Sequence, residues 1–358
     1  MQYDTPKGGR KLPYFDRRKP MKKKLSLLLC FLLVLNLCCT NAAFAGSEKT
    51  MYAKQQTWIY SSGYRTVKYC VCPIGKNQQV KVGAKVRATL PDGKKDYFYQ
   101  TSYFGKTFYI PADKLTTKKP KSSYKITYSF KDLQVTKNLG LYASPSTSSA
   151  KVRPAESRIY TIGKTNDWYV AFIGGNVRFI SKKSAAVKSV RKPTYVPLHI
   201  GSGYSSSKQK NIRNRFYLQY ALLPQYMRDA LAGRKAEIHV DPKLKEPFES
   251  GGNGGYTESS PTKSTIYVKE TGNTYNLEFA FHHEAGHAFS RYLWPGESIN
   301  QFAYLTKENA SLQLDSYYTT SASEWLAESI DVLIKDPNIL KAKAPKTYQF
   351  LMEQVFKK

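Results

Sequence analysis

The chain has 358 residues, of which 41% are hydrophobic, so a single small domain and a largely disordered protein are both excluded. At this length we expect two or three domains. There are 56 basic against 26 acidic residues, a net charge of +30, which predicts an anionic partner without choosing among nucleic acid, anionic lipid and an anionic cell wall.

The first 45 residues have the three parts of a secretory signal peptide. Lysines 22–24 precede an apolar run at 25–37, and a small-residue cleavage site follows at 43–45. A run of about 13 residues is too short to cross a bilayer core of about 30 Å. Met21 directly precedes the lysines and is an alternative start. We predict that residues 1–45 are removed, that no transmembrane anchor remains and that the mature protein is secreted; an uncleaved anchor is the alternative.

Two small all-β units are expected after the signal. Short alternating stretches separated by turn residues fill residues 51–117 and 124–188, with a lysine-rich linker between them. The stretches at 105–110 and 175–180 resemble two copies of the same hairpin. The pattern therefore predicts two repeats of one small β-barrel.

Signal cleavage would leave Cys70 and Cys72 as the cysteines of the mature chain. Two positions apart on a strand, they face the same side at the outer limit of disulfide reach. Their spacing is not that of a metal site. A local disulfide and a free thiol pair both remain open.

The second β-unit resembles bacterial SH3-like domains over residues 135–182. The resemblance rests on a Ser-Pro-Ser-Thr-Ser-Ser turn at 144–149, an Asn-Asp-Trp-Tyr-Val strand at 166–170 and the closing hairpin. The first unit is divergent, with Tyr97 where a tryptophan is expected. The resemblance implies SH3-like barrels that attach the protein to an anionic cell-wall polymer or peptidoglycan. Nucleic acid is not expected as the partner, because the signal sequence predicts a secreted protein. A plain spacer is the alternative.

Beyond a second linker at 188–193 the apolar spacing changes from two residues to three or four, which predicts helices. Two strands are expected among them, at 236–240 and 264–268. Helices are predicted at 208–231, 277–293, 301–312, 323–335 and 347–356. The fold class predicted for the whole chain is therefore multidomain, with N-terminal SH3-like barrels followed by an α+β, mainly helical domain at 192–358.

The helix at 277–293 carries His283-Glu284-Ala285-Gly286-His287, the H-E-x-x-H signature of zinc peptidases. Histidines four apart lie on one helix face and can bind one ion from the same side. Glu284 lies beside that face, where it can accept a proton from the attacking water. His282 points off the face and is interpreted as a packing or surface residue rather than a ligand. An ordinary polar helix face is the alternative for the whole motif.

No histidine follows His287, so the third protein ligand must be a carboxylate, or a tyrosine in an unusual site. Glu324 and Glu328 lie four apart on the predicted helix at 323–335. One of them could bind zinc while the other hydrogen-bonds a ligand histidine from behind.

Residues 192–358 resemble the catalytic domain of anthrax lethal factor and the secreted Pro-Pro endopeptidases. The resemblance rests on His-Glu-Ala-Gly-His-Ala at 283–288, Glu-Trp-Leu-Ala-Glu at 324–328 and Ala-Pro-Lys-Thr-Tyr-Gln-Phe at 344–350. It implies a zincin-like domain with one catalytic Zn²⁺, Glu324 as the third ligand and Tyr317 as hydrogen-bond donor to the substrate oxyanion. The adjacent Tyr318 is the alternative to Tyr317.

We therefore predict a secreted, cell-wall-associated zinc metalloendopeptidase that cleaves extracellular or cell-surface proteins, with proline-rich proteins as one candidate class. Glu284 is the expected general base. The strand at 264–268 is the expected edge strand for an extended substrate, and glycines 251–255 are the expected cover of the cleft. The alternatives are a peptidoglycan peptidase and a wall-binding protein with an inactive peptidase domain.

Overall fold

The computed structural model describes residues 48–89, 93–242, 254–260, 262–271, 276–294, 296–312 and 321–355. The expected signal segment at 1–45, with Met21, lies outside the described residues. Gly46–Lys358 cluster as one compact unit. Within the described ranges, no helix combines the length and apolar character needed to span a bilayer.

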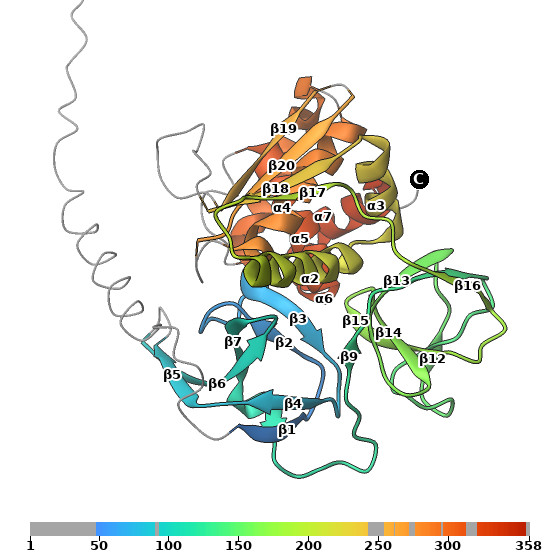
Figure 1. Cartoon of the computed structure of the whole chain (residues 1–358). Coiled ribbons are helices and arrows are strands. Elements are labelled where there is room, and N and C mark those ends of the chain that lie inside the picture. The colour runs from blue at the N-terminus through green and yellow to red at the C-terminus, as the bar shows by residue number, and fades with distance from the viewer. Residues whose placement is uncertain are drawn as a thin grey trace, which may run out of the picture. The chain divides into compact units, whose positions relative to one another are not determined.

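The first stretch of strands forms two open sheets (Figure 1). One has the order β4-β1-β8 and the other the order β3-β2-β7-β6-β5. The strands are β1 (Lys49–Ala53), β2 (Thr57–Tyr60), β3 (Cys70–Ile74), β4 (Gln79–Val82), β5 (Lys85–Thr89), β6 (Lys95–Tyr103), β7 (Lys106–Pro111) and β8 (Leu115–Thr116), with short 3-10 turns η1 (Val67–Tyr69) and η2 (Ala112–Lys114).

The next stretch of strands forms a sheet with the path β12-β11-β15-β14-β13-β10-β16, and β9 pairs with β13 beside this path. The strands are β9 (Thr127–Tyr128), β10 (Asp132–Val135), β11 (Leu141–Tyr142), β12 (Lys151–Val152), β13 (Arg158–Lys164), β14 (Trp168–Ile173), β15 (Asn176–Ser181) and β16 (Val187–Arg191).

The two predicted hairpins are present and share one turn geometry. Both central residues of each turn have positive φ: 44° and 72° at Phe104 and Gly105, 57° and 74° at Gly174 and Gly175. Two successive positive φ values define the tight turn whose twist matches that of paired strands. The two stretches therefore resemble each other in sequence because each forms the same kind of tight turn between paired strands.

The expectation of SH3-like barrels is wrong, because no closed barrel forms among the described strands. β3 shows the reason, since all five of its residues are buried. The Val71 carbonyl accepts a 2.8 Å hydrogen bond from Nε2 of Gln219, a residue of the C-terminal region. An independent barrel would leave one face of its strands to solvent, whereas this strand lies in a core shared by residues from Met51 to Leu351. Alternating patterns predict strands, but not the surface against which they pack.

The cysteine alternatives are also resolved, because Cys70 and Cys72 on β3 are both free thiols and both buried. Burial raises the pKa of the Cys72 thiol to about 12. Protonated, buried thiols of this kind pack as small apolar side chains.

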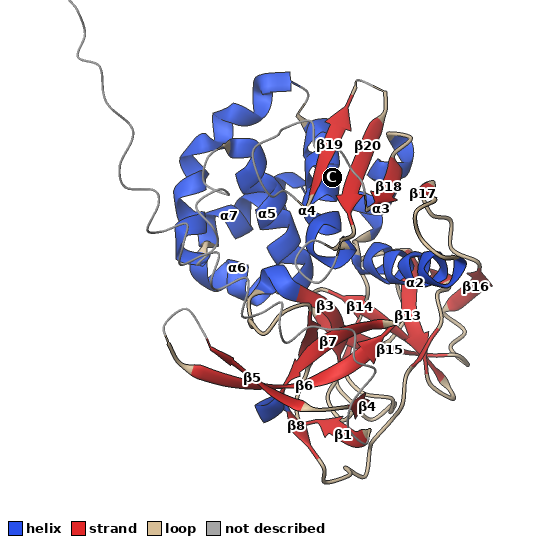
Figure 2. Ribbon diagram, turned by 60° about the vertical axis from the view of Figure 1, so that its left-hand side comes forward, coloured by secondary structure: helices blue, strands red, loops and turns tan. Residues whose placement is uncertain are grey.

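The C-terminal region has a four-stranded sheet with the order β17-β18-β20-β19 (Figure 2). β17, β18 and β20 run parallel, and β19 is antiparallel to β20. The strands are β17 (Leu198–Ile200), β18 (Glu237–Asp241), β19 (Gly255–Ser259) and β20 (Ser264–Lys269). The helical elements are α2 (Ser206–Leu222), α3 (Gln225–Gly233), α4 (Leu277–Leu293), the 3-10 segment η3 (Gly296–Leu312), α5 (Ala322–Lys335), α6 (Pro337–Lys343), α7 (Pro345–Phe350) and the π-helical turn η5 (Leu351–Val355).

The predicted fold class is therefore corrected to a mainly β-sheet protein of four sheets whose helices are mostly C-terminal. The predicted helix at 208–231 is also two helices. Leu223 caps the end of α2, and Pro224 caps the start of α3. Proline lacks a backbone N–H and cannot continue a helix that precedes it.

Candidate metal centre

The H-E-x-x-H motif lies in α4, whose bounds Leu277–Leu293 are those predicted from the sequence. The Asn276 side chain caps the helix by accepting a 3.0 Å hydrogen bond from the Phe279 N–H. Twelve of the helix residues are buried, and α4 packs against β19 and β20 on one side and α5 on another. The motif thus lies on a fixed helix inside the core.

α5 supplies the carboxylates, and Gly286 permits its close approach to α4. A Cβ at Gly286 would lie 2.9 Å from the Cα and 3.0 Å from the carbonyl oxygen of Ala327 on α5. Only a residue without a side chain fits at that separation. The helix-breaking cost of a mid-helix glycine therefore has a structural reason here.

His283, His287 and Glu324 meet between the two helices. The two Nε2 atoms lie 3.1 Å apart, and carboxylate oxygens of Glu324 lie 3.1 Å from Nε2 of His283 and 3.4 Å from Nε2 of His287. An ion bound tetrahedrally at about 2.1 Å from each ligand sets its donors about 3.4 Å apart. The residues therefore fit one metal ion, with a donor set of two imidazoles and one carboxylate.

The side chains of these three residues are 12%, 10% and 18% exposed, so the site is recessed but open to solvent on one side. A closed structural metal site would bury its fourth position as well. The arrangement leaves a direction from which a substrate could approach.

A second set of contacts orients the two imidazoles. Nδ1 of His283 lies 3.1 Å from Oε2 of Glu328, and Nδ1 of His287 lies 3.0 Å from Oγ of Ser323. With the proton on each Nδ1, both Nε2 lone pairs face the site. Glu328 thus takes the position predicted for it. Ser323 was not singled out from the sequence, although it directly precedes Glu324.

The electrostatics favour charge at the centre. Burial opposes a charged imidazole, but hydrogen bonds to Glu324 and then Glu328 outweigh it and raise the pKa of His283 to about 10. Burial likewise opposes the Glu324 carboxylate, yet hydrogen bonds from His283 and His287 hold its pKa well below the usual range. In the metal-free site the imidazolium and the Glu324 carboxylate thus pair with each other, and a bound cation would replace the imidazolium proton beside the carboxylate.

Glu284 is buried beside the ligand set and is held by β19. The hydroxyl of Thr257 lies 2.8 Å from Oε2 of Glu284 and 3.0 Å from the Glu284 carbonyl oxygen. Gly255 leaves room for the same side chain, since a Cβ there would lie 3.0 Å from Cγ of Glu284. Nothing in the sequence pointed to Thr257, because the strand that carries it is far from the motif along the chain.

His282 is a packing residue, the first of the two roles expected from its direction on the helix. It is fully buried, with Nε2 2.9 Å from the Gln219 carbonyl and Nδ1 3.4 Å from Oδ1 of Asp331. Asp331 in turn pairs with Lys335 at 2.8 Å. This network joins α4 to α2 and α5 behind the metal ligands.

The predicted edge strand is corrected. Residues 264–268 belong to β20, which lies between β18 and β19, whereas β19 is the strand at the end of the sheet. Within the glycine-rich stretch 251–255, the described residues Gly254 and Gly255 lead into β19, and 251–253 lie outside the described residues. Tyr317 and its alternative Tyr318 also lie outside them, so their predicted role stays a prediction.

No family model matches the chain, and no curated protein matches it. Among solved structures, the chain is similar to the Pro-Pro endopeptidase PPEP-2 from Paenibacillus alvei. The two are 22% identical, and the similarity covers 43% of this chain and 95% of that chain with a TM-score of 0.33. A TM-score at this level is too low to establish a shared fold or a shared activity.

Proposed function

We propose that this chain is a secreted zinc endopeptidase whose site is formed by α4, α5 and β19. One observation carries the proposal: two imidazoles and a carboxylate meet with donor separations of 3.1–3.4 Å beside a buried glutamate. Two histidines, one carboxylate and an adjacent general base form the ligand chemistry of hydrolytic zinc sites.

His283, His287 and Glu324 would hold the ion. Bound there, Zn²⁺ would polarise a substrate carbonyl and make water a stronger nucleophile at neutral pH. Glu284 accepts the proton of the attacking water and later delivers it to the leaving amine. The Thr257 hydroxyl positions the Glu284 carboxylate for both transfers by hydrogen bonding to Oε2.

β19 would bind the substrate backbone. Among the described strands it pairs on one side with β20, which leaves its other edge for an extended peptide. Gly255 and Thr257 bring this strand against Glu284, so a peptide paired along it would run past the ligand set. Tyr317 is retained as the proposed oxyanion donor on the strength of the lethal factor resemblance.

Export and a wall partner are proposed from the sequence. The signal pattern at 1–45 supports secretion, and the net charge of +23 that remains after its removal supports contact with an anionic extracellular polymer. Because the described strands form no SH3-like barrel, we propose that such contact depends on the basic surface rather than on a dedicated module.

The test is zinc content and peptidase activity measured on the same purified variants. We expect Glu324→Ala to lose zinc at this site and activity together, and Glu284→Gln to keep zinc and lose activity on a combinatorial peptide library. A Glu284→Gln enzyme that cleaves at the wild-type rate would refute the role of the base. A zinc content of Glu324→Ala equal to that of the wild-type protein would refute the ligand assignment.

A further inference from the structure

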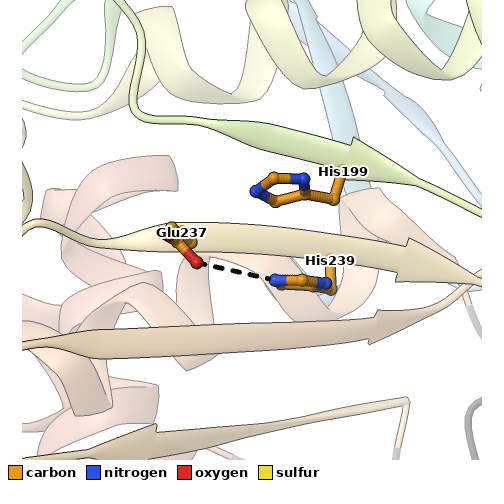
Figure 3. A group of neighbouring side chains, drawn as sticks. All are labelled: His199, Glu237 and His239. Carbon is orange, nitrogen blue, oxygen red and sulfur yellow. Dashed lines mark ion pairs between the residues drawn. The ribbon is translucent and has the colours of Figure 1, made fainter.

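A second cluster of metal-binding side chains lies on the outer face of the C-terminal sheet, and Figure 3 shows its three members. His199 comes from β17, while Glu237 and His239 come from β18. Each offers one ligand atom, and these atoms all lie within 4.8 Å of one another. Nothing in the proposed peptidase mechanism uses them.

The sheet itself places these residues together. β17 and β18 are parallel with His199 directly opposite His239, and neighbouring strands are about 4.8 Å apart. Glu237 is two residues before His239 and so points to the same face. The alternate positions Ile238 and Val240 are fully buried on the other face. The three side chains are therefore fixed to one surface by the backbone register, without a contribution from any flexible loop.

The donor chemistry selects the ligand class. Two imidazoles and one carboxylate suit Zn²⁺ and other borderline divalent transition ions, whereas Mg²⁺ and Ca²⁺ prefer oxygen ligands throughout. His199 is exposed and His239 is 36% exposed, so an ion can reach both.

Two features of the cluster set what binding requires. The ligand atoms lie within 4.8 Å of one another, whereas donors bound to one tetrahedral ion lie about 3.4 Å apart, so binding would require the side chains to rotate toward a common point. Such rotation is open to partly exposed rings because their terminal torsions are broad. In addition, Nζ of Lys263 lies 2.7 Å from Oε2 of Glu237, where its charge competes with that of an ion.

We propose that His199, Glu237 and His239 form a second divalent transition-metal site, distinct from the centre between α4 and α5. An ion held there would join β17 to β18. β17 has three residues and pairs, among the described strands, with β18 alone. The ion would therefore stabilise the edge of the sheet on the side opposite to β19.

A packing role is the competing explanation. The rings of His199, His239, Tyr267 and Tyr256 follow one another across the four strands, with successive centroids 4.5, 5.2 and 4.4 Å apart. Such cross-strand ring contacts stabilise a sheet without any metal. The two explanations differ for Glu237 and Lys263, which take no part in the ring contacts.

The experiment measures Zn²⁺ bound per chain by equilibrium dialysis and elemental analysis, with binding isotherms, in a Glu324→Ala background that disables the α4–α5 centre. We expect one bound ion in that background and none after adding His199→Ala and His239→Ala. Glu237→Gln leaves the rings in place and should weaken zinc binding at least about tenfold, because loss of a residue that only supports a metal ligand already lowers metal affinity by about that factor. Lys263→Met should strengthen it. Circular dichroism of each variant confirms that the sheet is retained.

The readouts separate this proposal from the peptidase proposal. Zinc binding that survives replacement of both histidines, or no binding in the Glu324→Ala background, overturns the second site. Equal affinity in Glu237→Gln and its parent also overturns it and leaves the packing role. If the α4–α5 centre binds no metal, the wild-type protein should still bind one zinc ion at the second site. Replacing His199 and His239 by alanine should abolish that binding. His199→Ala should leave peptide cleavage by the zinc-loaded enzyme at the wild-type rate.

Discussion

Replacing Gly286 by alanine tests whether the approach of α4 to α5 sets the metal centre. The new Cβ would lie 2.9 Å from the Ala327 Cα, and ordinary carbon contacts begin near 3.5 Å, so α5 must move away by roughly 0.6 Å. The obstacle is backbone, which cannot rotate aside. Overpacking of this kind costs about 1–3 kcal/mol, against about 1 kcal/mol gained from the better helix propensity of alanine.

Gly233→Ala is the matched control, since Gly233 also lies in a helix but a Cβ there meets nothing within 4 Å. We expect it to be neutral or stabilising by up to about 1 kcal/mol. Gly286→Ala should therefore be less stable than Gly233→Ala by about 1–3 kcal/mol in urea unfolding of the metal-free proteins.

The same shift would also move the carboxylate of α5 relative to the imidazoles of α4. A displacement of roughly 0.6 Å exceeds the tolerance of about 0.2 Å in metal–ligand distances, so Gly286→Ala should also bind zinc more weakly at the α4–α5 centre. Equal stability of the two alanine variants, with zinc affinity retained in both, would show that the close approach does not constrain the site.

Three further predictions follow from the contacts of the site and the core. Thr257→Val removes a hydrogen bond to the Glu284 carboxylate worth about 1.5–3 kcal/mol and should lower kcat/KM by at least about tenfold without changing zinc content. Thr257→Ser keeps the hydroxyl and should retain the wild-type kcat/KM. Equal rates in the two variants would refute the positioning role of Thr257. Glu328→Gln should weaken zinc binding about 10- to 100-fold in competition with a chelator, unless its contact with the ligand imidazole is incidental. Burial raises the pKa of Glu270, but the ion pairs with Arg215 and Lys106 together outweigh it, so the net shift of this pKa is downward. The stabilising effect of the carboxylate is therefore complete above the usual pKa of 4.5 and is lost as the pH falls below it. Glu270→Gln should flatten the acid side of the stability profile, and an unchanged profile would exclude this carboxylate.

The sequence predicted the structure best at the H-E-x-x-H helix and at the helix that carries Glu324 and Glu328. The bounds of α4 were predicted correctly because a helical period and the spacing of two histidines describe the same segment. The need for a carboxylate, inferred from the absence of a later histidine, led to a short segment that α5 indeed brings to the motif. Glu324 and Glu328 lie four residues apart, so a single helix delivers both the ligand and its neighbour.

Long-range pairing was the part that local patterns could not predict. β2 and β4 both lie in the stretch 51–117 that was predicted to form one small barrel, but they belong to different open sheets. β19 was not among the predicted strands, and β20, which was expected at the edge, has a neighbouring strand on each side. The role of Thr257 was not predicted for the same reason: its contact with Glu284 depends on how β19 packs against α4, which the residues around Thr257 do not reveal.

The buried strand β3 also bears on modularity. Gln219 donates to the Val71 carbonyl of β3 and accepts from His282, whose neighbour along the chain is a metal ligand. One N-terminal sheet is thus tied to the motif helix through one residue, since the side-chain amide of Gln219 contacts β3 and its backbone carbonyl contacts His282. We expect the whole described unit to unfold in a single cooperative transition. A fragment starting after the second linker would expose the side chains that β3 covers, so the smallest piece able to fold around the metal ligands must begin before that strand.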